Sequence, residues 1–392
     1  MLTSLAIIFL SGLILGNMFQ KMKLPSLIGM ILAGIIISPY GLNLLDDSIL
    51  GISGDLRQLA LVIILTRAGL TLEIRDLKKV GRPALLLCFL PACCEIIGVV
   101  LLAPMLLRIS QIEAALLGAV LAAVSPAVIV PRMIRLMEEG YGTNQKIPQM
   151  ILAGASVDDV FVIILFSSFL AMNQGKEVSM LQLVGVPISI LLGIALGVFG
   201  GFLFGQLVRW VQIRNAVQVI ILFSISFLFI ALQTLVERWV PISGLIAIMV
   251  MGIYLNKKNQ TVAGEIAISY QQLWIAAEII LFVLVGATVD LQYALSAGVQ
   301  AVLLVVFALC FRMVGVYVCL LKTQLSQKER MFTMLAYTPK ATVQASISWI
   351  PLSLGLSCGT MIMTVAVISI LVTAPFGACC IDRSYKRLLR EN

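Results

Sequence analysis

The sequence predicts an all-α membrane protein in which about thirteen helices cross the bilayer as two inverted six-helix repeats. Three observations predict this class: an apolar surplus, an alternation of basic loops, and two proline-interrupted spans. Of the 392 residues, 60% are hydrophobic and 12% are charged, and the mean hydropathy is +1.07. Soluble domains average about 45–50% apolar and about 25% charged residues. The composition therefore excludes a soluble enzyme, and the lack of polar–apolar alternation excludes a transmembrane β-barrel.

Apolar runs between polar or Pro/Gly breaks locate the spans, because a bilayer-crossing helix needs roughly 20 apolar residues. The longest gap between runs, from Gly41 to Leu56, is too short for a soluble domain, so the function must lie in or between the helices. The predicted spans are 2–19, 24–40, 57–73, 83–107, 112–137, 148–172, 180–208, 215–236, 240–256, 266–288, 292–321, 329–355 and 357–381.

The basic residues predict the orientation of these spans. The connections after odd-numbered spans, together with the C-terminus, carry twenty Lys and Arg residues, whereas the even-numbered connections carry four. Lys and Arg collect in cytoplasmic loops, so the N-terminus is expected outside and the C-terminus in the cytoplasm. Topology thus accounts for the net charge of +8, and no nucleic-acid partner is needed to explain it.

Two adjacent carboxylates lie near the middle of the sixth span, where residues 154–160 read GASVDDV. A charge at membrane depth costs at least about 2.5–3.5 kcal/mol on insertion scales. The functional interpretation is that a partly dehydrated monovalent cation competes with protons for Asp158 and Asp159; the alternative is a structural pair neutralised by Lys or Arg. Neighbours on a helix point about 100° apart, which argues against the coplanar dyad of an intramembrane aspartic peptidase.

Proline interrupts two other spans. The fifth contains Ser125, Pro126 and Pro131, and the twelfth contains Thr338 and Pro339. Proline frees a backbone carbonyl, which survives at membrane depth only inside protein or beside a wet cavity. An ordinary kink explains either helix alone. Together, however, the breaks fall on the fifth helix of each half, and discontinuous helices at matching positions of inverted repeats mark the substrate site of many secondary transporters.

Three further charges lie inside apolar spans near these motifs. Lys340 follows the second break, where its charge can neutralise the carbonyl ends of a broken helix. Arg312 on the eleventh span needs an acidic partner, and the sequence leaves Asp158 and Glu95 open as candidates.

Four residues are expected to support this site from nearby positions. Ser156 and Thr342 belong to the aspartate and second-break motifs. Arg67 is expected to pair with Glu73 or with an acidic residue on another span, in a structural role. Glu278 is left open between an entry-funnel residue and a buried partner.

The motifs together resemble the monovalent cation/proton antiporter superfamily. They are Ser-Pro-Ala-x-x-x-Pro at 125–131, Ala-Ser-x-Asp-Asp at 155–159, the buried Arg312, and Pro-Lys-Ala-Thr-Val-Gln-Ala at 339–345. More narrowly, the chain looks like the two-aspartate branch, and especially like sodium/proton antiporters of the solute carrier 9B group. The likeness extends over nearly the whole chain.

This resemblance implies the sodium/proton antiporter fold, with two crossed discontinuous helices in a core that moves as an elevator against a homodimer scaffold. It matches Asp159 to the essential carboxylate and Asp158 to the second carboxylate of the branch. The ranges that it assigns are 1–82 and 215–291 for the scaffold, 83–179 and 292–382 for the ion-transporting core, and 180–214 for a linker helix.

One residue departs from the pattern of the branch. Many bacterial members carry lysine where this chain has Arg312, and lysine there forms a titratable pair with the first aspartate. Arginine is effectively never deprotonated, and Glu95 is available to pair with it. Exchange of two protons per sodium is therefore not implied.

The sequence thus predicts a secondary transporter, and no enzyme, that exchanges Na⁺ or Li⁺ for H⁺ without a cofactor. A bacterial inner membrane is the expected location. With no histidine in the chain, a pH response is expected to come from the carboxylates. The alternatives are a K⁺/H⁺ antiporter or K⁺-efflux system of the same fold, a membrane enzyme, and a sodium-coupled symporter for organic solutes.

Overall fold

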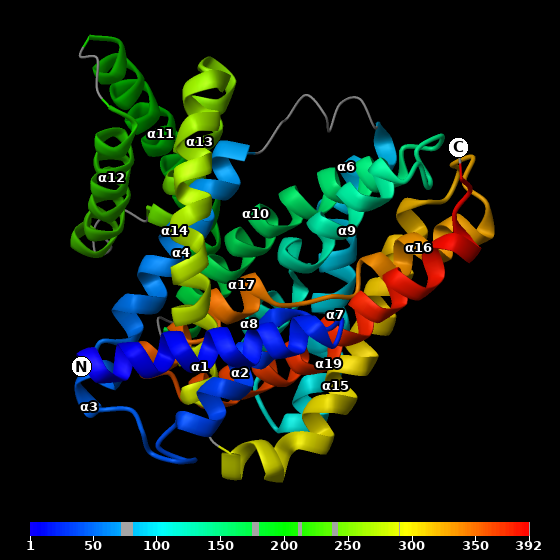
Figure 1. Cartoon of the computed structure of the whole chain (residues 1–392), viewed down its shortest axis with the longest axis horizontal. Coiled ribbons are helices and arrows are strands. Elements are labelled where there is room, and N and C mark those ends of the chain that lie inside the picture. Colours follow the sequence, from blue (N-terminus) through cyan, green and yellow to red (C-terminus); the bar gives the residue numbers. More distant parts are fainter. Residues whose placement is uncertain (72–80, 175–179, 211–213, 237–241, 290, 392) are drawn as a thin grey trace. The chain divides into compact units, whose positions relative to one another are not determined.

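The computed structural model describes residues 1–71, 81–174, 180–210, 214–236, 242–289 and 291–391, with the side chains of 156, 180–187 and 291–297 outside this description. The secondary-structure elements of the described chain are all helices (Figure 1). Within these ranges, extended pairing is limited to an isolated antiparallel bridge between Tyr141 and Glu391. The predicted all-α class is therefore confirmed.

The helices follow the predicted apolar runs, and three runs are divided into shorter helices. In chain order the helices are α1 (Leu2–Lys21), α2 (Ser26–Ile37), α3 (Asp47–Gly51), α4 (Ser53–Thr71), α6 (Arg82–Leu87), α7 (Leu90–Leu107), α8 (Gln111–Ala122), α9 (Pro126–Glu138), α10 (Ile147–Asn173), α11 (Met180–Trp210), α12 (Asn215–Val236), α13 (Gly244–Lys258), α14 (Gln260–Ala287), α15 (Leu291–Cys319), α16 (Gln327–Ala336), α17 (Thr342–Ile347), α18 (Ile350–Ser353) and α19 (Gly359–Leu388).

Nine helical stretches of the described chain are long and apolar enough to cross a membrane, when α6–α7 and α8–α9 are each taken as one stretch. α2 is a shorter apolar helix, and α4, α13 and α16–α18 fall outside the nine. The count of about thirteen spans stays a prediction.

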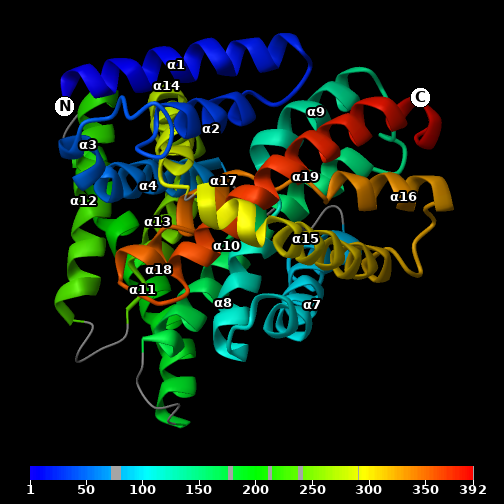
Figure 2. The ribbon, with the colours of Figure 1, turned by 90° about the horizontal axis from the view of Figure 1, so that it is seen from below.

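Two compact units make up the chain. The first comprises residues 1–57, 75–162 and 279–392. Within it α7 packs against α8 and α15, and α19 packs against α15, α16 and α9 (Figure 2). Its buried apolar cluster joins α9, α10, α16 and α19 through side chains such as Leu136, Ile151 and Phe332.

The second unit comprises residues 58–74 and 163–278, and within it α13 packs against α11 and α12. These units group residues by contact, whereas the predicted scaffold and core are defined by relative movement. The predicted division into scaffold, core and linker therefore stays a prediction.

Capping boxes define where two of the helices begin. Ser110 accepts a hydrogen bond from the backbone of Glu113, whose carboxylate accepts one from the Ser110 backbone, at 3.2 and 2.9 Å. Ser326 and Glu329 repeat the arrangement at the start of α16, at 3.3 and 2.7 Å. Such boxes satisfy backbone donors that have no helical partner. The two helices fixed in this way, α8 and α16, are the first halves of the two broken spans.

Backbones of α2 and α14 come into direct contact at two glycines. A Cβ at Gly34 would lie 2.0 Å from the carbonyl oxygen of Val283, and one at Gly286 would lie 2.1 Å from that of Ile31. Small residues at membrane helix interfaces allow this approach. The pair of helices therefore depends on both glycines.

We expect Gly34→Ala to lower the thermal unfolding temperature of the purified protein. Its methyl group would collide with backbone that cannot rotate away, and overpacking of this kind costs about 1–3 kcal/mol. The matched control is Gly264→Ala on α14, where the added Cβ meets no described atom within 4 Å. Equal unfolding temperatures for the two variants would contradict the close packing of α2 on α14.

Candidate functional site

Each of the two proline-containing spans is interrupted by a short non-helical segment at or next to its first proline. Residues 123–125 separate α8 from α9, which begins at Pro126, and residues 337–341 separate α16 from α17. The two breaks touch, because the backbone N–H of Ser125 donates a hydrogen bond to the carbonyl of Pro339 at 2.8 Å. Pro131, by contrast, lies inside α9, which continues through it.

The carbonyl groups at the end of α8 are satisfied by side chains from the second half of the chain. These carbonyls have no partner in their own helix, since the chain turns away after Ala122. The donors are Lys340 Nζ to Leu121 O, Arg312 Nη1 to Ala122 O, and Gln344 Nε2 to Ala123 O at 2.7 Å. The cationic groups thus lie at the negative end of the α8 helix dipole.

Glu95, Asp158, Arg312 and Lys340 form a buried charge cluster. Arg312 Nη1 lies 3.0 Å from Glu95 Oε2, and Arg312 Nη2 lies 2.8 Å from Asp158 Oδ2. Lys340 Nζ lies 2.6 Å from Glu95 Oε1. Each of these side chains is at most 1% exposed. Arg312 therefore contacts both of the acidic residues that the sequence left open, because one guanidinium carries enough donors for both.

The two aspartates have different surroundings on α10. Oδ2 of Asp158 accepts from Arg312 and also from the backbone N–H of Val124, at 3.0 Å. Asp159 is 8% exposed and takes part in no ion pair within 4.0 Å with any described residue. Asp158 is thus held by a charge partner, and Asp159 is not.

Several buried oxygens near the breaks have no hydrogen-bond partner among the described residues. They include Asp158 Oδ1, Asp159 Oδ1, Ser125 Oγ and Thr342 Oγ1. Carboxylate and hydroxyl oxygens are the ligands that hard cations prefer. The arrangement can therefore hold a small dehydrated cation or accept protons.

Tyr337, in the second break, lies against α10 one turn before Asp158. A Cβ at Gly154 would be 2.0 Å from the Tyr337 hydroxyl, so only glycine leaves room for the ring. The Arg312 guanidinium lies 5.7 Å from the ring centre, and its Nε donates to the Tyr337 carbonyl at 2.9 Å. Tyr337 thus helps to hold Arg312 beside Asp158.

The remaining predicted residues are divided between the two units. Thr338 is buried in the second break and donates to the carbonyl of Leu335 at 2.8 Å. The side chain of Ser156 lies outside the described residues. Arg67 and Glu278 belong to the second unit, where their charges interact. Glu73, the other partner considered for Arg67, also lies outside the description.

Two residues of the site, Gln344 and Tyr337, are not among the residues predicted from the sequence. Gln344 is fully buried in α17, and it lies inside the 339–345 motif, which carried the family resemblance. An amide in an otherwise apolar stretch is the signal that could have selected it. No comparable signal singles out Tyr337, because its position depends on the glycine at 154 on another helix.

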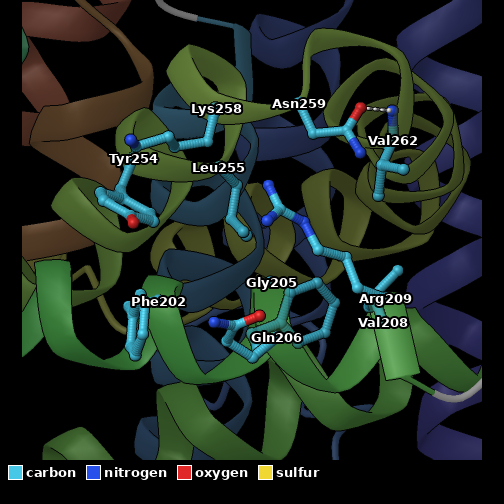
Figure 3. A pocket seen from close by; sticks show the side chains of 11 residues that line it. Phe202, Gly205, Gln206, Val208, Arg209, Tyr254, Leu255, Lys258, Asn259 and Val262 are labelled. Carbon is cyan, nitrogen blue, oxygen red and sulfur yellow. Dashed lines mark hydrogen bonds between the residues drawn. The ribbon is translucent and has the colours of Figure 1, made fainter.

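One cavity of the second unit is separate from these residues. It has a volume of about 140 Å³ and lies between the ends of α11 and α13 (Figure 3). The side chain of Arg209 points into it, and Lys258 and Tyr254 line it (Figure 3). None of the predicted site residues lines this cavity.

The far end of α9 is tied to the C-terminal end of α19. Arg132 pairs with Asp382 at 3.0 Å, and Glu139 accepts hydrogen bonds from Arg135 at 2.6 Å and from the Tyr385 hydroxyl at 3.0 Å. These two hydrogen bonds hold the pKa of Glu139 below its ordinary value. The half-helix that begins at the first break is therefore anchored at its other end.

The fold and the site define a class of protein. A helical membrane protein whose two discontinuous helices meet beside buried carboxylates is a secondary transporter of small solutes or ions. The chain belongs to the sodium/hydrogen exchanger family, since the family model described as "Sodium/hydrogen exchanger, transmembrane" matches residues 5–381. The resemblance drawn from the motifs is confirmed, and the protein is an integral membrane protein.

Characterised relatives and a solved structure agree with this assignment. Sodium/hydrogen exchanger 9B2 of Homo sapiens is 30% identical, with 100% of this chain and 75% of that protein covered. Sodium/hydrogen exchanger 9B1 of Homo sapiens is 31% identical, with 96% and 76% covered. The sodium proton antiporter MjNhaP1 from Methanocaldococcus jannaschii superimposes with a TM-score of 0.84 at 20% identity, over 98% of this chain and 97% of that chain. The chain therefore has the predicted antiporter fold.

Glu95→Gln is expected to destabilise the protein strongly. It leaves Arg312 and Lys340 buried with Asp158 as their remaining carboxylate in the cluster, and removing one partner of a buried pair costs about 3–5 kcal/mol. Thermal unfolding of the purified variant measures the effect. The control is Glu265→Gln, which makes the same change at an exposed position of α14. A loss no larger than that of the control would show that the cluster does not stabilise the fold.

The stabilisation provided by Glu139 should depend on pH in a defined direction. Because its pKa is lowered in the folded chain, its contribution is present above the ordinary value of 4.5 and is lost as the pH falls through the lowered pKa. Unfolding temperatures of wild type and Glu139→Gln, compared between about pH 3 and 7, should differ at neutral pH and converge in acid. Tyr385→Phe removes one of the two hydrogen bonds and should give a smaller difference of the same sign. A difference that grows as the pH falls would contradict this assignment.

Proposed function

We propose that this protein exchanges Na⁺ or Li⁺ for H⁺ across a membrane, with cation and protons competing for Asp158 and Asp159. The observation that carries the proposal is the pair of aspartates with unpartnered buried oxygens beside two broken helices that touch. Family membership supports sodium/proton exchange, and the names of the 9B relatives agree with it.

The roles of the two aspartates follow from their partners. Asp159 has no ion pair among the described residues, so it is proposed as the carboxylate that binds one proton or one cation in turn. Asp158 contributes Oδ1 to the cation while its other oxygen stays with Arg312 and Val124. Arg312 carries no proton, since arginine stays protonated in proteins. Binding therefore requires ionised aspartate, and protonation displaces the cation.

Transport would follow by alternating access of the elevator type. In this proposal the core of residues 83–179 and 292–382 moves against a homodimer scaffold of residues 1–82 and 215–291, and residues 180–214 link the two. The core crosses only when it is protonated or loaded with a cation. No enzymatic step and no cofactor are part of the proposal.

The proposed orientation has the N-terminus outside and the C-terminus in the cytoplasm. Its support is the asymmetry of basic residues between alternate connections. The bacterial inner membrane stays the predicted location.

The experiment is proton movement driven by Na⁺, Li⁺ or K⁺ in proteoliposomes, with the membrane potential clamped or free. Wild type is expected to exchange Na⁺ or Li⁺ for H⁺, and Asp159→Asn is expected to fall to the level of protein-free liposomes. The matched control is Asp47→Asn, an exposed aspartate on the short helix α3, which should retain exchange.

Each outcome of this experiment separates the alternatives. Full exchange by well-expressed Asp159→Asn would overturn the assignment. Exchange of K⁺ in preference to Na⁺ would indicate the K⁺/H⁺ antiporter, and ion flux without proton movement would indicate the efflux system. An exchange rate that does not depend on the membrane potential would establish one proton per cation.

A further inference from the structure

The peptide unit between Ala123 and Val124 is bonded on both of its sides. Its carbonyl, on Ala123, accepts from Gln344 Nε2 at 2.7 Å. Its N–H, on Val124, donates to Asp158 Oδ2 at 3.0 Å. A peptide unit is planar, so the direction of the carbonyl also fixes the direction of the N–H. The side chain of Gln344 is thus connected to Asp158 through one rigid group.

We propose that Gln344 is a positioning residue for ion exchange, which orients the Ala123–Val124 peptide toward Asp158 and thereby sets the pH range in which exchange occurs. The inference rests on the proposed function, because it assumes that Asp158 and Asp159 bind the exchanged ions. It adds an uncharged residue that acts on Asp158 through the backbone.

The side-chain hydrogen bonds of Gln344 go to the end of α8 and the first break. Gln344 is fully buried, and its Nε2 also lies 3.3 Å from the carbonyl of Leu121. Its Oε1 has no hydrogen-bond partner among the described residues. The two neighbouring donors to this break, Arg312 and Lys340, are also committed to carboxylates of the charge cluster. Gln344 is therefore the donor whose hydrogen bonds with the described residues go only to the carbonyls of this break.

The physical effect follows from hydrogen bonding to a charged group. A donor to an ionised carboxylate favours the ionised form, and a carbonyl that accepts a hydrogen bond makes the N–H of its peptide a stronger donor. No bulk water at membrane depth can replace the amide. Without Gln344 the peptide loses one of the two hydrogen bonds that orient it, Asp158 is held less well as a ligand for the cation, and protons compete better with the cation.

A substitution at Gln344 removes none of the other groups that act on Asp158; one of them, Lys340, shares the carbonyl of Leu121 with Gln344 as an acceptor. The charged neighbours are Arg312, Lys340 and Asp159, and the neutral titratable ones are Tyr337, Cys88 and Cys93. Glu95 acts on Asp158 through their common partner Arg312. A shift in pH dependence therefore reports the loss of the hydrogen bonds from Gln344 to the carbonyls of Ala123 and Leu121.

The test is Na⁺-driven proton movement in proteoliposomes of Gln344→Met, measured across pH and across Na⁺ concentration. Methionine keeps the length of the side chain and lacks the donor. The pH of half-maximal exchange should rise by about half a unit to one unit, and at a fixed pH near the midpoint the apparent KM for Na⁺ should rise roughly three- to tenfold. At saturating Na⁺ and alkaline pH the maximal rate should stay within about twofold of wild type, because the ligands themselves are intact.

The matched control is Gln218→Met on α12, which removes another buried amide in the second unit. The pH of half-maximal exchange of this control variant should equal that of wild type. If Gln344→Met yields no monodisperse protein, Gln344→Asn takes its place. That variant keeps a buried amide but is one methylene too short to hold both carbonyls, and its midpoint should rise in the same direction.

Two results would overturn the inference. One is a folded Gln344 variant with the midpoint and apparent KM of wild type. The other is a lower maximal rate at an unchanged midpoint, which is the signature of a structural role. Both require that wild type exchanges Na⁺ for H⁺; if wild type moves no protons, the proposed function itself has failed, and the two failures are thereby distinguished.

Discussion

The constraint on which the site depends is that backbone carbonyls inside a membrane protein have no bulk water to bond with. α8 ends within the protein and leaves its last carbonyls without helical partners. Side chains from the second half of the chain satisfy them, and two of those side chains are cationic. Because these cations are held by the carbonyls, their positions determine where carboxylates can lie. The side chains that donate hydrogen bonds to these carbonyls are those of Lys340, Arg312 and Gln344.

The two halves of the chain depend on each other at this point. Each first half-helix, α8 or α16, starts at a capping box, so its register is set before it reaches the break. The breaks then share a backbone hydrogen bond from Ser125 to Pro339. Movement of one break without the other would leave this donor and acceptor unpaired inside the protein, which is unfavourable. The two breaks are therefore expected to move as one body.

Much of this arrangement could be predicted because its residues break local rules. A proline in an apolar helix and a charge at membrane depth are each unfavourable alone, so Pro126, Pro339 and the aspartate pair stand out in the sequence. Glu95 and Asp158 could be predicted as candidate partners of Arg312, but the sequence could not show that both bind it, since they lie 217 and 154 residues away and the guanidinium has donors for both. Pro131 breaks the same rule as the other prolines, yet α9 continues through it, so the rule alone does not locate a break.

The charge balance of the site gives a physical reason for obligatory exchange. Two carboxylates and two cationic groups compensate each other in the buried charge cluster, and Asp159 lies outside this balance. In the proposed function, one proton or one monovalent cation on Asp159 brings the site to neutrality, whereas an empty site keeps an uncompensated charge. Carrying such a charge through a low-dielectric region is costly. A core with these residues would therefore cross readily in its two loaded forms and poorly when empty, which is the condition for antiport without leak.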